Sequence, residues 1–464
     1  MIKRLHILGI CGTAMAAIAA LAREQGWQVS GSDVGIYPPM SDYLRELGIG
    51  IAAFDVANLE PAPELVVIGN ALSRGNVEVE AVLDRGLAYT SGAQFIGDHI
   101  LPGRQGVVVA GTHGKTTSAS LMAHVLDRAG LAPGFMIGGI PEDFGGGARL
   151  GHGDAFVLEG DEYDTAFFDK RSKFLHYHAR TLILNNLEFD HADIFDDLEA
   201  IKRQFHHLLR TVPSSGSIVV NADDVNLADV LARGCWTPLT TFARFGGMAA
   251  DWHWEALSDD GSSFRLYRDG EPVLQTSWGM IGVHNVANAC AVAAAASGMG
   301  VSAEVCRGAF ASFSGVRRRM TLVGEARGIR VFDDFAHHPT AIKGMVSAAK
   351  ASMGGKGKLR VVLEPRSNTM RSRIHQERLP ACFDAADEVL FVPASDRNLA
   401  PDAVLDVGAV CAAIGEKAHV LPDADAIIAH LREHAGQGDD VLILSNGGFA
   451  GIHKRLLERL RQDA

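Results

Sequence analysis

Short apolar segments alternate with helical segments along almost the whole chain of 464 residues. Alternation of this kind predicts parallel sheets whose strands are joined by crossover helices, which is the α/β fold class. A chain of this length is expected to form about three domains. The sequence shows neither an internal repeat nor a low-complexity segment.

Segments rich in glycine and proline indicate where the domains begin and end. We expect a Rossmann-like domain over residues 1–103, a central domain over 104–316 and a second Rossmann-like domain over 317–464. The central domain is expected to be a P-loop ATPase-like parallel sheet with added antiparallel strands, which the tryptophan-bearing stretch 236–281 would supply. The clearest expected strands read RLHILGI, QVSGSD, LVVIGN, AYTS, GVVVAG, AFVLEG, TLILNN, IRVFDD, LRVVLEP, EVLFVP, AHVLP and DVLILSN.

The net charge and the cysteine content indicate which kinds of partner and which cellular compartment to expect. The net charge of −12 argues against a nucleic-acid partner, because such proteins present a basic face. The six cysteines form no C-x-x-C pair and no zinc-ligand spacing, which is typical of reduced thiols in a cytoplasmic protein. No stretch suggests membrane insertion, and nothing in the sequence indicates the oligomeric state.

The N-terminal segment MIKRLHILGICGTAMAAIAALA has the basic start and apolar run of a signal peptide. His6 interrupts the run, and Gly9 and Gly12 stand where a strand would turn into a helix. The next segment, QGWQVSGSD, reads as a second strand, so we expect the first segment to belong to the fold.

The stretch VVVAGTHGKTTSASLM at 107–122 places a glycine-containing loop between an apolar strand and a helix. A usual phosphate-binding loop reads G-x-x-x-x-G-K-[ST], but Val109 occupies the first glycine position and the upstream glycine is Gly111. Backbone N–H groups of such a loop point at a phosphate, Lys115 would meet the β- and γ-phosphates, and Thr116 can ligate Mg²⁺. The competing interpretation is a tight turn with a solvated lysine.

Acidic and imidazole groups follow two neighbouring expected strands. Glu159 ends the strand AFVLEG, and three more acidic residues, Asp161, Glu162 and Asp164, come directly after it. His191 follows the strand TLILNN. Because sheet chemistry lies at the carboxyl ends of strands, Glu159 and His191 are expected to approach the loop. Each of the three later acidic residues could equally belong to a solvated surface.

Two asparagines in GVHNVANACAVAAAA, Asn285 and Asn288, are three residues apart and would share one face of a helix. A carboxamide can pair with a purine edge because it carries both a donor and an acceptor. Capping of the helix by Asn285 is the alternative.

The motifs GTHGKTT, FDHAD, HNVANA, RRRM and DDFAHHPT occur in one order along the chain, and together with Glu159 they cover its whole length. This pattern resembles the Mur ligases, which are ATP-dependent amide-forming enzymes of peptidoglycan metabolism. The short G-x-x-G-K-T-T loop is characteristic of that family. The resemblance therefore implies ATP and Mg²⁺ as cofactors.

The resemblance also implies roles for individual residues. The ATP phosphates would be bound by Gly111, Thr112, His113, Gly114, Lys115, Thr116 and Thr117. One Mg²⁺ would lie on Thr116 and Glu159, with a second held in part by His191. The rest of the nucleotide would meet Asn285, Asn288, Arg319 and Asp334. Lys115, His191 and His337 would be the catalytic residues. Other family members use a carbamylated lysine, for which Lys202 gives no clear match.

Two branches of the family share UDP-N-acetylmuramate as acceptor. One joins it to L-alanine and the other to the tripeptide L-alanyl-γ-D-glutamyl-meso-diaminopimelate. The segment 159–197 resembles the tripeptide branch, and the alanine branch is the alternative. The substrates would be met by Gly9, Gly12 and Asp33 at the UDP end, and by Arg366, Arg371 and Arg373 at the peptide carboxylates.

Two other classes of function remain open from the sequence. A dinuclear metallohydrolase could draw on the histidines His176, His178, His191, His206 and His207. It would leave the GKTT motif without a role, and it predicts hydrolysis without ATP. A nucleotide-binding regulator without catalysis predicts ATP binding but no substrate-dependent release of ADP.

Overall fold

A computed structural model describes residues 3–37, 40–396 and 399–462. The chain forms two compact units, each assembled from segments that are distant in sequence. The first comprises Met1–Glu188, Leu198–His253 and Ala289–Phe310, and the second comprises Phe189–Asp197, Trp254–Asn288 and Ala311–Ala464.

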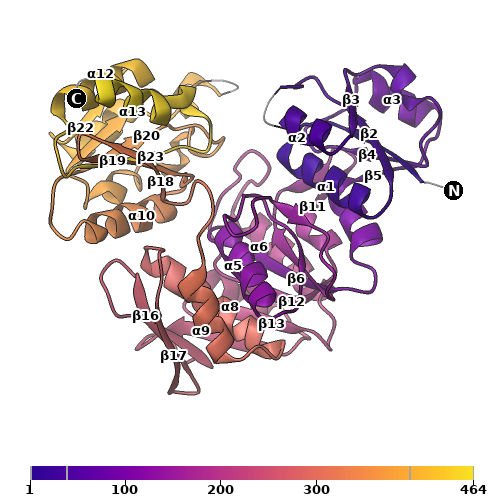
Figure 1. Cartoon of the computed structure of the whole chain (residues 1–464), viewed down its shortest axis with the longest axis horizontal. Coiled ribbons are helices and arrows are strands. Elements are labelled where there is room, and N and C mark those ends of the chain that lie inside the picture. The colour runs from indigo at the N-terminus through magenta and orange to yellow at the C-terminus, as the bar shows by residue number, and fades with distance from the viewer. Residues whose placement is uncertain (1–2, 38–39, 397–398, 463–464) are drawn as a thin grey trace. The chain divides into compact units, whose positions relative to one another are not determined.

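The first unit begins with a five-stranded parallel sheet of order β3-β2-β1-β4-β5 (Figure 1). Its strands are β1 Arg4–Leu8, β2 Gln28–Ser32, β3 Gly50–Ala52, β4 Leu65–Ile68 and β5 Tyr89–Ser91. The connecting helices are α1 Thr13–Glu24, α2 Met40–Glu46, η1 Val56–Leu59, α3 Val77–Asp84, α4 Gly92–Phe95 and η2 Ile96–Ile100. The apolar N-terminal segment thus forms β1 and α1 of this sheet, as its glycines predicted.

Seven consecutive strands of a second sheet lie in this unit, in the order β14-β13-β12-β6-β9-β7-β8, and every neighbouring pair among them is parallel except β7 and β8. Its strands are β6 Gln105–Ala110, β7 Gly134–Met136, β8 Ala148–Arg149, β9 Ala155–Gly160, β12 Ala179–Leu184, β13 Ser217–Asn221 and β14 Leu239–Arg244. A small hairpin, β10 Asp164–Ala166 and β11 Asp169–Ser172, and the turn η3 Lys173–His176 lie between β9 and β12 along the chain.

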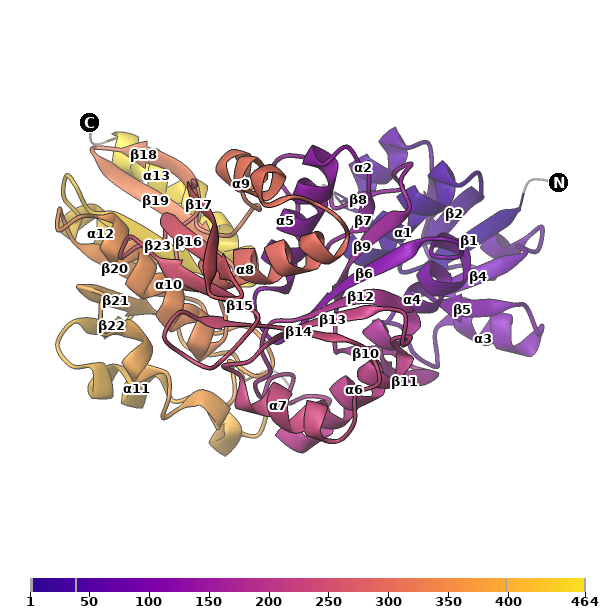
Figure 2. The same ribbon diagram turned by 90° about the horizontal axis from the view of Figure 1, so that it is seen from below.

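Helices cover both faces of this second sheet. Figure 2 shows α5 on one side of the central strands and α6 and α7 on the other. Their bounds are α5 Lys115–Arg128, α6 Leu198–Thr211 and α7 Val225–Ala232, and α8 Val283–Gly298 and α9 Ala303–Ser312 follow later in the chain. Strand β6 is buried along its last five residues because it is covered on both faces. Its carboxyl end leads directly into the glycine loop.

The stretch 236–281 contains β14 and then β15 Trp252–Ala256, β16 Ser263–Arg268 and β17 Glu271–Ser277. β16 and β17 pair in antiparallel fashion, which confirms the expected antiparallel strands there. β14 pairs on its other side with β13, which lies before this stretch, and that pair is parallel. Helix α7 connects these two strands, and a crossover of this kind returns the chain in the same direction.

The second unit contains a six-stranded sheet of order β18-β19-β23-β20-β21-β22. Its strands are β18 Thr321–Ala326, β19 Ile329–Asp334, β20 Leu359–Leu363, β21 Glu388–Phe391, β22 Ala418–Val420 and β23 Asp440–Leu444. All neighbours are parallel except β18 and β19. The helices are α10 Pro339–Ser352, α11 Val407–Ile414, α12 Ala424–His434 and α13 Ile452–Gln462, with 3₁₀ turns η4 Arg373–His375, η5 Pro380–Phe383, η6 Pro401–Ala403 and η7 Phe449–Gly451.

Successive residues of β20 enter two different cores. Val361 and Leu363 pack with α10 and α11, while Val362 packs with α12 and α13. Figure 1 shows α10 on one side of this sheet and α12 and α13 on the other. Side chains alternate across a strand, so a strand apolar at every position requires cover on both faces. These sheets confirm the α/β fold with parallel sheets.

Within the described ranges, no helix combines the length and apolar composition that a membrane span requires.

Candidate active site

The glycine loop follows the buried strand β6 and ends where helix α5 begins at Lys115. Gly114 precedes the helix with φ +78°, a left-handed conformation that a residue with a side chain adopts at a cost. At Gly111 a Cβ atom would lie 3.0 Å from the carbonyl oxygen of Asn186. The first N–H groups of α5 have no partner within the helix and can therefore meet an anion.

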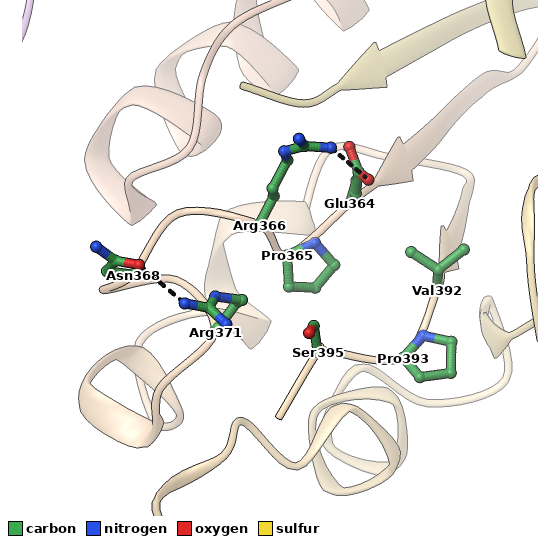
Figure 3. A pocket seen from close by; sticks show the side chains of 8 residues that line it. All are labelled: Glu364, Pro365, Arg366, Asn368, Arg371, Val392, Pro393 and Ser395. Carbon is green, nitrogen blue, oxygen red and sulfur yellow. Dashed lines mark hydrogen bonds and ion pairs between the residues drawn. The ribbon is translucent and has the colours of Figure 1, made fainter. Parts of the chain in front are cut away.

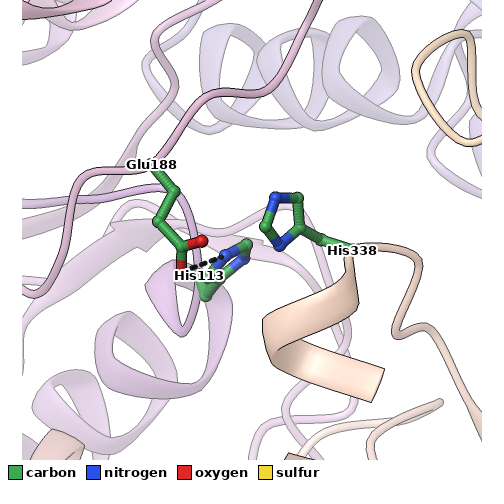
Figure 4. Close-up of side chains that lie close together, drawn as sticks. All are labelled: His113, Glu188 and His338. Carbon is green, nitrogen blue, oxygen red and sulfur yellow. Dashed lines mark ion pairs between the residues drawn. The ribbon is translucent and has the colours of Figure 1, made fainter. Parts of the chain in front are cut away.

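A second segment, just after β12, fixes the middle of the loop. The backbone N–H of His113 donates to Asn186 Oδ1 at 2.7 Å, and the Thr112 N–H donates to the Asn186 carbonyl at 3.2 Å. Glu188 pairs with His113 at 3.4 Å, and its N–H donates to Thr112 Oγ1 at 2.8 Å (Figure 4). Asn186 was not predicted, and its position directly after a buried strand is the only signal the sequence offers.

Two carboxylates, one at the end of β9 and one just after it, meet the functional side chains of the loop. Thr116 Oγ1 donates to Glu159 Oε1 at 2.8 Å, and the Gly138 N–H donates to Glu159 Oε2 at 2.8 Å. Lys115 Nζ lies 2.8 Å from Glu162 Oε2 and 3.1 Å from Glu162 Oε1. The expected approach of Glu159 to the loop is therefore seen within the first unit.

The three acidic residues that follow Glu159 have different surroundings. Glu162 is only 1% exposed, so the surface interpretation is wrong for it. Asp161 pairs with Lys173 at 2.7 Å, and Asp164 pairs with Lys170 at 2.6 Å. Burial alone would lower the pKa of Lys115, but the carboxylates of Glu162 and Asp161 outweigh it and raise the pKa above its usual value. Lys115 is thus held as a cation.

The second unit gathers imidazoles around a buried carboxylate. Asp190 is 6% exposed and accepts a hydrogen bond from the backbone N–H of His191 at 2.7 Å. Burial raises the pKa of Asp190, but the charges of His191 and His337 lower it further, so the net pKa lies well below the usual range. His191 and His337 are therefore electrostatic neighbours of one aspartate. Their approach to Glu159, which belongs to the first unit, stays a prediction.

Both predicted asparagines lie near the start of α8 and are buried. The side-chain amide of Asn288 donates to Asn285 Oδ1 at 3.2 Å, which confirms that the two share a face. Asn285 donates in turn to the carbonyl of Ile281 at 2.7 Å. Asn285 lies inside the helix rather than before it, so the helix-capping alternative is wrong.

Asp334 ends β19 and is 1% exposed. Its two oxygens accept hydrogen bonds from the backbone N–H groups of Met320 and Ala336, both at 2.7 Å. Burial raises its pKa, and the charge of Arg319 opposes that rise. The Arg319 guanidinium lies 5.3 Å from the ring centroid of Phe335. In this structure Asp334 therefore fixes the segment that leads into the C-terminal sheet.

A cavity of about 500 Å³ lies at the carboxyl ends of β20 and β21 (Figure 3). It is lined by Glu364, Pro365, Arg366, Asn368, Arg371, Val392, Pro393 and Ser395. Two of the three predicted arginines, Arg366 and Arg371, thus come together, and Arg371 Nη2 donates to Asn368 Oδ1 at 2.8 Å. Arg373 is not among the lining residues, and its Nε donates to the Val404 carbonyl at 3.2 Å.

The N-terminal glycine turn is held by Asp33. Gly9 has φ +78°, and Gly12 precedes α1 without a side-chain cap. Asp33 Oδ2 accepts from the Cys11 N–H at 2.9 Å, and Oδ1 accepts from the Gly35 N–H at 2.8 Å. The uncapped N-terminus of α1 presents backbone N–H groups that can meet an anion, while contact of this turn with a diphosphate and of Asp33 with a ribose stay predictions.

Two of the histidines of the metallohydrolase alternative, His176 and His206, have other partners. His176 pairs with Asp169 at 3.0 Å, and His206 stacks on Trp236 with ring centroids 6.2 Å apart. Across the described part of the chain, neither belongs to a group of three or more close histidine, cysteine or acidic ligand atoms. Their surroundings therefore argue against a metal site on His176 or His206.

Comparison with known proteins gives three adjacent matches along the chain. Residues 4–103 match the Mur ligase family catalytic domain, residues 109–296 the Mur ligase middle domain, and residues 318–447 the Mur ligase glutamate ligase domain. Together these ranges span three domains and most of the chain.

Individual relatives are similar over nearly their full length. The Escherichia coli UDP-N-acetylmuramate--L-alanyl-gamma-D-glutamyl-meso-2,6-diaminoheptandioate ligase is 47% identical, with 99% of each chain covered. A crystal structure of a murein peptide ligase from Psychrobacter arcticus superposes with a TM-score of 0.74 at 43% identity, again covering 99% of each chain. The UDP-N-acetylmuramate--L-alanine ligase of Geotalea daltonii is 31% identical, with 99% of each chain covered. The chain belongs to the Mur ligase family.

Proposed function

We propose that this protein is an ATP-dependent ligase that joins the lactoyl carboxylate of UDP-N-acetylmuramate to the alanyl amine of L-alanyl-γ-D-glutamyl-meso-diaminopimelate. The observation that carries the proposal is the identity of 47% to a relative named for that tripeptide, against 31% to a relative named for L-alanine. The phosphate loop and the arginine-lined cavity supply the chemistry that such a reaction needs.

The loop and its carboxylate neighbours fit ATP and Mg²⁺. Thr116 Oγ1 and Glu159 Oε1 are oxygen atoms 2.8 Å apart, and oxygen ligands are those that Mg²⁺ prefers. We assign one Mg²⁺ to this pair and give His191 a part in holding a second. When bound, the metal neutralises charge on the phosphate oxygens.

The protein's own part in the first step is positioning and charge neutralisation. Lys115 would leave Glu162 and meet the phosphate oxygens of ATP, while the N–H groups of residues 111–117 surround them. The lactoyl carboxylate attacks the γ-phosphorus, the bond to the β-phosphate oxygen breaks, and ADP leaves. The product is an acyl phosphate.

In the second step the neutral amine of the tripeptide attacks the acyl carbonyl. The C–N bond forms, the C–O bond to phosphate breaks, and the amine loses a proton as inorganic phosphate leaves. His337 is proposed as a catalytic residue here, near Asp190 and His191 in the second unit. No residue is assigned as the base.

The remaining site residues receive roles in substrate binding. Asn285 and Asn288 are proposed to contact adenine, and Arg319 and Asp334 the rest of the nucleotide. Gly9, Gly12 and Asp33 are proposed to hold the UDP group, and Arg366 and Arg371 the peptide carboxylates. Because ATP and nucleotide-linked precursors are cytoplasmic compounds, we place the reaction in the cytoplasm.

The test measures release of ADP from ATP and Mg²⁺ with UDP-N-acetylmuramate and either the tripeptide or L-alanine. We expect release with the tripeptide. Release with alanine alone would favour the alanine ligase, and release with neither would contradict a ligase. Lys115→Ala should reduce turnover by at least about a hundredfold, whereas a metallohydrolase would stay active and a nucleotide-binding regulator would bind ATP without turnover.

A further inference from the structure

The cavity at the ends of β20 and β21 carries both signs of charge. Glu364 and Arg366 line it, and Glu364 Oε1 lies 3.6 Å from Arg366 Nη1. That separation exceeds a hydrogen bond, so the two groups are neighbours without being locked together. Figure 3 shows this pair on one side of the cavity and Arg371 with Asn368 on another.

Glu364 and Arg366 differ in how firmly they are held. Ser445 Oγ donates a hydrogen bond to Glu364 Oε2, and the Glu364 side chain is 18% exposed. The Arg366 side chain is 55% exposed. Glu364 is therefore a fixed anion at the wall of the cavity, while Arg366 can turn toward a ligand without losing a short ion pair.

Resting on the proposed function, we infer that Glu364 is the specificity-determining residue that binds the distal ammonium of the peptide substrate. The far end of meso-diaminopimelate carries an ammonium and a carboxylate on one carbon atom. A carboxylate acceptor beside a mobile guanidinium matches that arrangement, because each group meets the opposite charge. Val392 and Pro393 line the same cavity and offer apolar contact for the methylene chain.

Arginines alone would bind any peptide with enough carboxylates. Glu364 adds a preference for positive charge, because a peptide that lacks the ammonium would leave this mostly buried carboxylate with the Arg366 guanidinium 3.6 Å away and no hydrogen bond from the peptide. The cavity would thereby reject a peptide that ends in a simple dicarboxylic chain. The discrimination depends on Glu364, whereas overall affinity for the peptide depends also on the arginines.

The experiment compares two peptides in ADP release with ATP, Mg²⁺ and UDP-N-acetylmuramate. One is the natural tripeptide and the other carries 2-aminopimelate in place of diaminopimelate, so that only the distal ammonium is missing. The wild type should prefer the natural peptide by about 10- to 100-fold in kcat/KM, the range of one hydrogen bond to a charged group. In Glu364→Gln that preference should fall to about threefold or less, because the amide still accepts from Ser445 but carries no charge.

Glu416→Gln is the matched control, since Glu416 is exposed in the same domain and does not line the cavity. It should keep the full preference. Equal rates for the two peptides in the wild type, or an undiminished preference in Glu364→Gln with an unchanged melting temperature, would overturn the inference while leaving the ligase in place. Absence of ADP release by the wild type with the natural tripeptide would instead remove the proposed function, and this inference with it.

Discussion

Lys115 Nζ lies 2.8 Å from Glu162 Oε2 and 3.1 Å from Glu162 Oε1, so the lysine of the phosphate loop is paired with a carboxylate. The Lys115 and Glu162 side chains are 12% and 2% exposed. A buried cation without a counter-charge is costly, and Glu162 supplies that charge. If Lys115 meets the phosphates as proposed, we expect ATP to compete with Glu162 for it.

Glu162→Gln should lower the stability of the nucleotide-free protein and increase its response to ATP. Breaking a buried ion pair by removing one partner costs about 3–5 kcal/mol. Phosphate restores a negative charge beside Lys115, so ATP with Mg²⁺ should raise the melting temperature more in the variant than in the wild type. Thermal unfolding with and without ATP and Mg²⁺ measures both effects.

Asp164→Asn is the control for that variant. Asp164 pairs with Lys170, whose side chain is 70% exposed, and an exposed pair contributes less than about 1 kcal/mol. Its melting temperature and its ATP response should stay close to those of the wild type. An ATP response in Glu162→Gln that is equal to or smaller than the wild-type response would contradict the exchange of partners at Lys115.

Gly114→Ala should weaken both the fold and ATP binding. Gly114 has φ +78°, and a residue with a side chain loses about 1–2 kcal/mol in that conformation. Relaxation of the strain would rotate the N–H groups at the start of α5 away from the phosphate, which should raise the KM for ATP. Gly298→Ala is the control, because no neighbouring atom lies within 4 Å of an added Cβ at the end of α8. An unchanged KM for ATP in Gly114→Ala would contradict this account of the loop.

Asp190→Asn should destabilise the protein at neutral pH and have less effect in acid. The pKa of Asp190 is lowered in the folded chain, so its ionised form contributes stability above the unfolded pKa, about 4. That contribution declines as the pH falls below 4 toward the folded value. Urea unfolding of variant and wild type from pH 3 to 7 measures the difference, with the exposed Asp402→Asn as control. A difference in the free energy of unfolding between Asp190→Asn and wild type that grows toward pH 3 would contradict the lowered pKa of Asp190.

The long buried strands of the fold could be predicted from their composition, whereas the short strand β3 and the edge strand β18 could not. β6, β20 and β23 are apolar at nearly every position, which is the pattern of parallel strands covered on both faces. β3 has three residues and none is buried. β18 has one buried residue and runs antiparallel at a sheet edge. It is recognised as a strand by its pairing with β19, because its sequence carries no apolar pattern.

The candidate site likewise contains residues that the sequence predicts and residues that only the structure reveals. Gly114, Lys115 and Glu159 were predicted because strand, loop and carboxylate each leave a local pattern in the sequence. Glu162 stood among acidic neighbours that look alike, and only tertiary packing places it against Lys115. Asn186 acts through its backbone carbonyl as well as its side chain, and a contact made by a backbone atom leaves no signal in residue type.

The variants Arg366→Ala and Arg373→Ala should show which of the predicted arginines binds the peptide. Arg366 lines the cavity, so its loss should raise the KM for the tripeptide by about tenfold, as expected for one charge-assisted hydrogen bond, with little change in the KM for ATP. Arg373 donates to the Val404 carbonyl outside the cavity lining, so its loss should leave the tripeptide KM within about twofold. Steady-state ADP release at varied tripeptide concentration measures both. If Arg373→Ala raised the tripeptide KM and Arg366→Ala did not, the peptide carboxylates would bind outside this cavity.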